Sequence, residues 1–90
     1  MSDSSERNGE EVRNIAEKAY RLLQACAVEA FGRPGVYVLR EPVMDRANIS
    51  GVAEFVAIAE YLDRMGWIAE ADDDYGVFVV TLAGLREATS

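Results

Sequence analysis

The fold of this chain is decided by Tyr61-Leu62-Asp63-Arg64-Met65-Gly66-Trp67-Ile68 and, after an acidic turn, by Phe78-Val79-Val80-Thr81-Leu82-Ala83-Gly84. The first stretch closes an amphipathic helix, because a glycine such as Gly66 readily takes the left-handed conformation that ends helices. The segments 67–71 and 77–81 are rich in β-branched and aromatic residues and flank the turn 72–76, which predicts an antiparallel hairpin. The second half of the chain is therefore predicted to run from a helix into a hairpin.

The helix before this hairpin is predicted over residues 51–65. The turn 48–51 supplies candidate N-caps for it, and one face carries the apolar residues expected in the core: Phe55, Ile58, Ala59 and Leu62. On the distal hairpin strand, alternation points Phe78 and Val80 inward and Val77 and Val79 to the other face.

The first half of the chain predicts three further elements. A long helix over 10–31 carries a broad apolar face and is stopped by Gly32 and Pro34. A brief strand over 35–39 follows, and Pro42 suits the first turn of a short helix that extends to about residue 48. At the other end of the chain, Thr81 is expected to cap a short helical turn that extends to Leu85.

The length and composition of the chain bound its class. Ninety residues, of which 50% are hydrophobic, predict a single folded domain over 10–90 behind a flexible polar tail over 1–9. A domain of this size buries a modest core, which favours self-association. No targeting segment and no membrane-spanning run is visible, so we expect a cytoplasmic protein that does not enter a membrane.

The order of predicted elements resembles that of the winged helix-turn-helix superfamily, and the resemblance covers roughly residues 10–88. Its most specific part is Tyr61-Leu62, Gly66-Trp67-Ile68 and the pattern Phe78-x-Val80-Thr81-x-x-Gly84. The resemblance implies a mostly helical α+β fold, a winged helix with the order α-β-α-α-β-β and a short C-terminal helical turn. It also implies that residues 50–65 occupy the place of the recognition helix.

The charge of the chain argues for a protein partner. The net charge is −7, and residues 35–90 hold four basic against ten acidic side chains. Such a surface repels phosphate and favours basic partners, unless the acidity reflects the habitat of the source organism. We therefore expect a small non-catalytic protein that acts as a protein-interaction or regulatory module through its acidic surface. The residues expected to contact the partner are Glu54, Glu60, Tyr61, Asp72, Asp73, Asp74, Val77 and Val79.

The alternative is a DNA-binding transcriptional regulator that uses helix 50–65 for recognition. Base readout is served by Arg, Lys, Asn or Gln near the N-terminus of that helix, where this chain has Ala53 and Glu54. The basic residues left for DNA contact are Arg40, Arg46 and Arg64. Phosphate contacts dominate non-specific affinity, so the aspartates of the turn disfavour this alternative.

Apolar residues remain after the core is assigned, and they predict a homodimer. Ala25 and Val28 are expected on the far side of the first helix, and the distal hairpin strand is expected to offer an edge for pairing. The first helix or that edge would form a symmetric interface.

Several chemistries are excluded by composition. The chain has no histidine and a single cysteine, so it lacks a Ser-His or Cys-His nucleophile and a thiolate zinc site. Cys26 is expected to be a buried core thiol. The run of three aspartates lacks the spacing of a calcium loop. We expect no catalytic residues, no metal and no cofactor.

Overall fold

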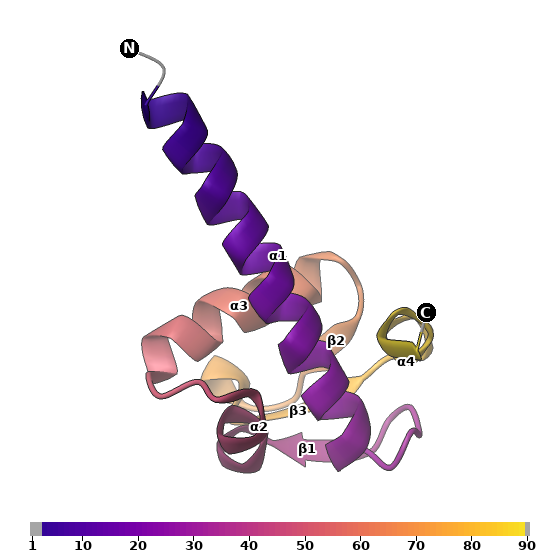
Figure 1. The fold of residues 1–90 in the computed structure, drawn as a ribbon. Coiled ribbons are helices and arrows are strands. Elements are labelled where there is room, and N and C mark those ends of the chain that lie inside the picture. The colour runs from indigo at the N-terminus through magenta and orange to yellow at the C-terminus, as the bar shows by residue number, and fades with distance from the viewer. Residues whose placement is uncertain (1–2, 90) are drawn as a thin grey trace.

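Helices and strands follow each other in the order α-β-α-α-β-β-α, and the strands form one three-stranded antiparallel sheet. The computed structural model describes the backbone of residues 3–89 and the side chains of residues 15–89. The elements are α1 (Asp3–Glu29), β1 (Tyr37–Leu39), α2 (Arg40–Ala47), α3 (Val52–Arg64), β2 (Ile68–Glu70), the 3₁₀ turn η1 (Asp73–Tyr75), β3 (Val77–Val80) and α4 (Leu82–Thr89). The predicted fold class, mostly helical α+β with this element order, is confirmed (Figure 1).

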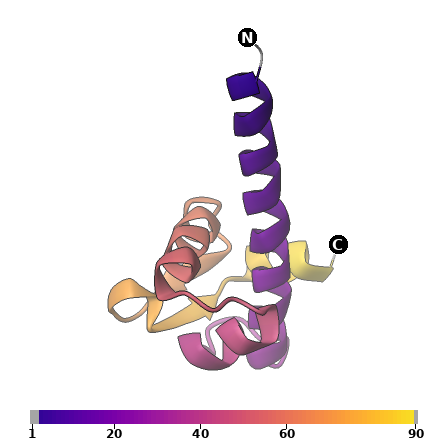
Figure 2. The same cartoon turned by 60° about the vertical axis from the view of Figure 1, so that its left-hand side comes forward.

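The long helix α1 projects beyond the rest of the molecule (Figures 1 and 2). Its later turns contact α2, α3 and α4, and α4 lies on the opposite side of α1 from α3 in Figure 2. The residues of α1 buried in this way include Ala19, Leu22, Leu23, Cys26 and Ala30, as the apolar pattern predicts. Ile15 and Ala16 belong to the same predicted apolar face but are exposed, because this part of the helix lies beyond the elements that cover the later turns.

The start of α1 differs from the sequence prediction, since the helix begins at Asp3 and not near Glu10. The expected tail over 1–9 includes residues outside the described part of the chain, and its flexibility stays a prediction. At the other end, α1 stops at Glu29, and Phe31 and Gly32 both have positive φ. These two residues turn the chain toward β1.

The sheet order is β1-β3-β2, so β3 is the central strand and pairs with both neighbours. Phe78 and Val80 point inward and are fully buried, as predicted. The rings of Phe55 and Phe78 lie 6.0 Å apart and join α3 to the sheet. The predicted core face of α3 is confirmed, because Phe55, Ile58, Ala59 and Leu62 are all buried.

The helix α2 starts before the proline that was expected to open it. Leu39 is extended, with φ −91° and ψ 143°, and serves as the N-cap of a helix that begins at Arg40. Pro42 then occupies the third helical position, where a backbone N–H has no partner within the helix and its loss costs nothing. Asn48 ends α2 in the left-handed conformation.

The C-terminal element is a helix of eight residues and extends well beyond the short turn expected through Leu85. Thr81 caps it as predicted: its Oγ1 accepts a hydrogen bond from the N–H of Gly84 at 3.0 Å. The same hydroxyl donates to the carbonyl of Gly66 at 2.7 Å. The helix persists because it packs against α1, a contact that local sequence does not reveal.

Gly84 provides the first testable prediction. A Cβ at this position would lie 2.1 Å from the carbonyl oxygen of Trp67, so Gly84→Ala forces backbone atoms apart. We expect the free energy of unfolding to fall by about 2 to 3 kcal/mol. Urea denaturation followed by Trp67 fluorescence measures this loss.

Gly76→Ala is the matched control. Gly76 has φ −60°, and its added Cβ would meet the nearest atom, the carbonyl oxygen of Asp73, at an ordinary 3.4 Å. This substitution should change stability by less than about 1 kcal/mol. Equal losses for the two variants would contradict the packing argument.

Candidate functional site

The acidic turn, defined here as residues 72–76, has a fixed internal structure. The Asp72 carboxylate accepts a hydrogen bond from the N–H of Asp73 at 2.8 Å, and the N–H of Gly76 donates to the carbonyl of Asp73 at 3.1 Å. Asp74 and Tyr75 both have φ 56°, a conformation that is uncommon for residues other than glycine and rare for a bulky side chain such as Tyr75. The surrounding contacts therefore dictate the shape of the turn.

Tyr75 is the anchor of the acidic turn. Its side chain is buried, and its hydroxyl donates to the Asp63 carboxylate on α3 at 2.7 Å. Its backbone N–H donates to the Glu70 carboxylate on β2 at 3.3 Å. From the other side, Nη1 of Arg40 donates to the carbonyl of Asp74 at 3.2 Å. Contacts from three elements hold the acidic turn in place.

The acidic turn and α3 present their carboxylates together. Burial raises the pKa of Tyr75, and the hydrogen bond to Asp63 and the negative charges of Asp63, Glu70 and Glu60 raise it further. Asp63 and Glu70 contact the turn through hydrogen bonds, and Glu60 lies about one helical turn before Asp63 on α3. We define the acidic surface as Glu60, Asp63, Glu70, Asp72, Asp73 and Asp74. Its shape depends on Tyr75, to which the sequence analysis gave no role, although Tyr75 is the only aromatic residue in an otherwise charged loop.

Two of the residues expected at the partner surface lie elsewhere or are partly covered. Glu54 lies at the other end of α3, where it pairs with Lys18 of α1 at 3.6 Å. Tyr61 is half-buried and packs against the core. The acidic surface therefore includes Glu60 and the three aspartates of the sequence prediction but excludes Glu54.

Val77 and Val79 lie on the outer face of the sheet, next to the acidic turn. Val79 faces Tyr37 of β1 and Ala69 of β2, and Val77 faces Leu39. The outer face is thus apolar. The expected pairing edge on this strand is wrong, however, because β3 is central and both of its edges are already occupied.

The three arginines expected to contact DNA occupy separate places. Arg40 is tied to the acidic turn through Asp74, and its Nε is buried without a hydrogen-bond partner. Arg46, on α2, bonds Glu29 through Nε and Nη2, both at 3.0 Å. Arg64 is exposed at the C-terminal end of α3. Two of these three arginines are thus engaged by groups of their own chain: Arg40 by the Asp74 carbonyl and Arg46 by the Glu29 carboxylate.

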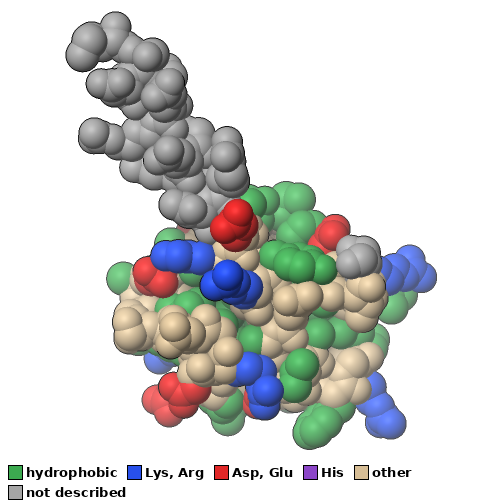
Figure 3. Space-filling model, in the orientation of Figure 1, with side chains coloured by type: hydrophobic (Ala, Val, Ile, Leu, Met, Phe, Trp, Pro, Cys, Tyr) green, Lys and Arg blue, Asp and Glu red, His purple; other side chains and the backbone are tan. Residues whose placement is uncertain are grey.

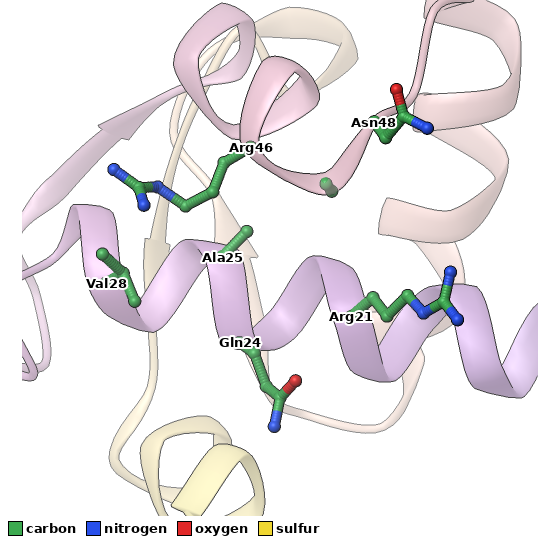
Figure 4. A pocket seen from close by; sticks show the side chains of 7 residues that line it. Arg21, Gln24, Ala25, Val28, Arg46 and Asn48 are labelled. Atoms are coloured by element: carbon green, nitrogen blue, oxygen red, sulfur yellow. The ribbon is translucent and has the colours of Figure 1, made fainter.

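An open groove of about 420 Å³ lies between α1 and α2 (Figure 4). Ala25 and Ala47 are small residues at the crossing of the two helices, and Arg21 and Arg46 lie on either side of them. Ala25 was expected on an exposed surface and is instead buried in this crossing, whereas Val28 is exposed as expected. The face seen in Figure 3 carries Lys and Arg side chains interspersed with Asp and Glu side chains. Glu29 pairs with Arg46 of this groove at 3.0 Å.

Cys26 is buried in the core, and burial raises the pKa of its thiol, which leaves it an inert packing residue. Among the residues that the structure describes, no three His, Cys, Asp or Glu side chains converge as a metal site would require. None of the described helices combines the length and apolar character that crossing a membrane requires.

Comparison of the chain with protein-family models, with curated proteins and with solved structures gives no significant match.

Tyr75→Phe tests the anchor of the acidic turn. Loss of the hydrogen bond to Asp63 should lower the free energy of unfolding by about 1 to 2 kcal/mol at neutral pH. Because the pKa of Tyr75 is higher in the folded than in the unfolded chain, this stabilisation is present below the ordinary tyrosine pKa of about 10 and is lost as pH rises above it. The difference between wild type and variant should therefore shrink in alkaline solution.

Denaturation at neutral pH and at about pH 10.5 measures both effects. Tyr61→Phe is the control, because the Tyr61 hydroxyl makes none of the hydrogen bonds described here and its removal should leave stability unchanged at both pH values. A Tyr75→Phe loss that is independent of pH would rule out the proposed role of the hydroxyl.

Proposed function

We propose that this chain is a winged-helix domain without catalytic activity that docks a basic segment of a partner protein. In this interpretation α2 and α3 are the helix-turn-helix, β2 and β3 are the wing, and the acidic turn is the wing tip. The observation that carries the proposal is the acidic surface, in which six carboxylates gather where a DNA-binding winged helix would meet phosphate.

The structure of the acidic turn supports recognition by charge. Tyr75, Glu70 and Arg40 hold its backbone, so Asp73 and Asp74 are presented without the entropy loss of ordering a loose loop. Nearby carboxylates also raise the local negative potential, which speeds encounter with a cationic partner. The acidic turn is thus suited to steer and orient a segment that carries Lys or Arg.

The apolar outer face of the sheet supports the choice of a protein partner. Val77 and Val79 follow the acidic turn directly and are only half-buried. Burial of such side chains contributes about 25 cal/mol per Å² of apolar area, which charge contacts at an exposed rim do not supply. A segment with one basic and one apolar face matches both parts of this surface.

DNA binding is the competing outcome. The N-terminal turn of α3 exposes Val52, Ala53 and Glu54, which offer no base-edge donors, and the wing tip is negative. The three arginines that would contact phosphate are separated or already paired. We therefore expect no binding of a duplex.

The test compares two fluorescently labelled probes by anisotropy in roughly 50 mM salt, where phosphate contacts are strong. The first is an amphipathic peptide of lysine and leucine, and the second is a mixed-sequence DNA duplex. We expect saturable binding of the peptide and none of the duplex at tens of micromolar protein. Duplex binding that weakens steeply with added salt would replace this proposal with the DNA-binding alternative.

A charge-neutral variant locates the peptide. Asp73→Asn with Asp74→Asn removes two charges, and asparagine tolerates the left-handed conformation at position 74. Peptide affinity should fall about fivefold, since each exposed ion pair contributes up to about 1 kcal/mol. Glu17→Gln with Asp45→Asn changes net charge equally at exposed positions outside the acidic surface. If both variants lose affinity alike, the peptide recognises overall charge and not the acidic turn.

A further inference from the structure

The strand β1 is an edge strand with an uncovered outer side. It pairs with β3 alone. The N–H of Arg40 donates to the carbonyl of Gly76 at 3.1 Å, so these two residues form a hydrogen-bonded pair, and Val38 and Phe78 form the next such pair along the ladder. Hydrogen-bonded pairs alternate along an antiparallel ladder, so Tyr37 and Leu39 direct their backbone groups to the outer edge. The Leu39 carbonyl begins the helical bonds of α2. The Leu39 N–H and the backbone groups of Tyr37 are left at the edge.

This edge has one of the devices that usually prevent pairing, its shortness, and lacks the others. Soluble proteins also protect edge strands with lysine, proline or a bulge, whereas β1 is Tyr-Val-Leu in regular register. Tyr37 is 73% and Leu39 58% exposed, both on the apolar outer face of the sheet. The strand has three residues and offers few hydrogen bonds, so its side chains must supply most of the energy of any pairing.

We infer that a second copy of this chain pairs with this edge, with the two β1 strands antiparallel about a two-fold axis at Val38. The Leu39 N–H of each copy then donates to the Tyr37 carbonyl of the other. Tyr37 packs against Leu39 of the second copy on the outer face, an aromatic-aliphatic pair at cross-strand distance. The interface is isologous, with the same residues contributed by both copies.

The charges that flank β1 favour this occupant and this direction. Arg33 precedes the strand and Glu41 follows it, and both are exposed, whereas Arg40, which also follows the strand, donates to the carbonyl of Asp74 in its own copy. Antiparallel pairing brings the end with Arg33 to the end with Glu41 of the second copy, whereas parallel pairing would bring like charges together. The edge is therefore complementary to itself.

A second feature matches the same symmetry. Phe31 is 84% exposed on the loop that leads into β1. At the other end of the strand, a hollow of about 270 Å³ is lined by Leu39, Arg40, Glu41, Pro42 and Gly76. The two-fold axis brings the loop with Phe31 to the end of the second copy where this hollow lies. Each copy thus supplies both an apolar projection and a recess.

Sedimentation equilibrium of the full chain over roughly 5 to 500 µM should show a monomer–dimer equilibrium, as expected for a small interface. Tyr37→Lys places a charge on the edge and should raise the dissociation constant at least tenfold. Leu82→Lys makes the same kind of change at a 53% exposed residue of α4 and should leave the equilibrium unaltered. A wild-type chain that stays monomeric throughout this range would overturn the inference.

Directed disulfide formation tests the register, and in the mixed pair one of the two contacts between Tyr37 and Leu39 stays intact. Tyr37→Cys and Leu39→Cys chains, distinguished by mass and mixed in equal amounts, should oxidise mainly to the mixed pair. Residues 37 and 39 of opposite copies face each other, whereas two residues at position 37 lie too far apart for a disulfide. The buried Cys26 stays inert, which a wild-type control verifies. A random mixture of disulfides, or none, would contradict the two-fold pairing.

The inference is independent of the proposed function, and the same variants separate the two. Asp73→Asn with Asp74→Asn should weaken binding of the lysine-leucine peptide and leave the monomer–dimer equilibrium unchanged. If Tyr37→Lys leaves the monomer–dimer equilibrium unchanged, β1 is not the dimer edge and the inference fails. Failure of peptide binding with an intact dimer would count only against the proposed function.

Discussion

The central position of β3 is the constraint on which the rest of the structure depends. This strand of four residues pairs with β1, from the first half of the chain, and with β2, from the same hairpin. Its inner side chains, Phe78 and Val80, are fully buried, and Phe78 meets Phe55 of α3. Residues distant in sequence are thereby joined through one short segment. The placement of the acidic turn before β3 and of α4 after it follows directly from that segment.

Much of this arrangement is legible in the sequence because it depends on local pattern. The core face of α3, the inward residues of β3 and the helix stop at Gly66 all follow from periodicity and glycine chemistry. The pairing of β1 with β3 cannot be predicted in this way, since strand neighbours distant in sequence leave no local signal. For that reason the sequence prediction wrongly treated β3 as an edge strand. The length of α4 was missed for a similar reason, because contact with α1 stabilises it.

The candidate surface shows the same division. The aspartates of the acidic turn are plain in the sequence, and their excess charge identifies them without any structure. Their fixed geometry cannot be read from the sequence, because it depends on two distant contacts. Tyr75 reaches the Asp63 carboxylate on α3, and Arg40, at the β1–α2 junction, donates to the carbonyl of Asp74. Burial of Tyr75 within a group of negative charges is favourable only while its hydroxyl stays protonated. The acidic surface therefore has a fixed geometry as well as a high charge.

The hydroxyl of Thr81 joins the end of α3 to the start of α4, since it donates to Gly66 and accepts from Gly84. The N–H of Thr81 also donates to the carbonyl of Trp67, so the backbone between the two helices is tied at successive residues. The N-cap of α4 thus depends on a side chain that is also bonded to the α3–β2 turn. Any displacement of that turn therefore weakens the start of the last helix.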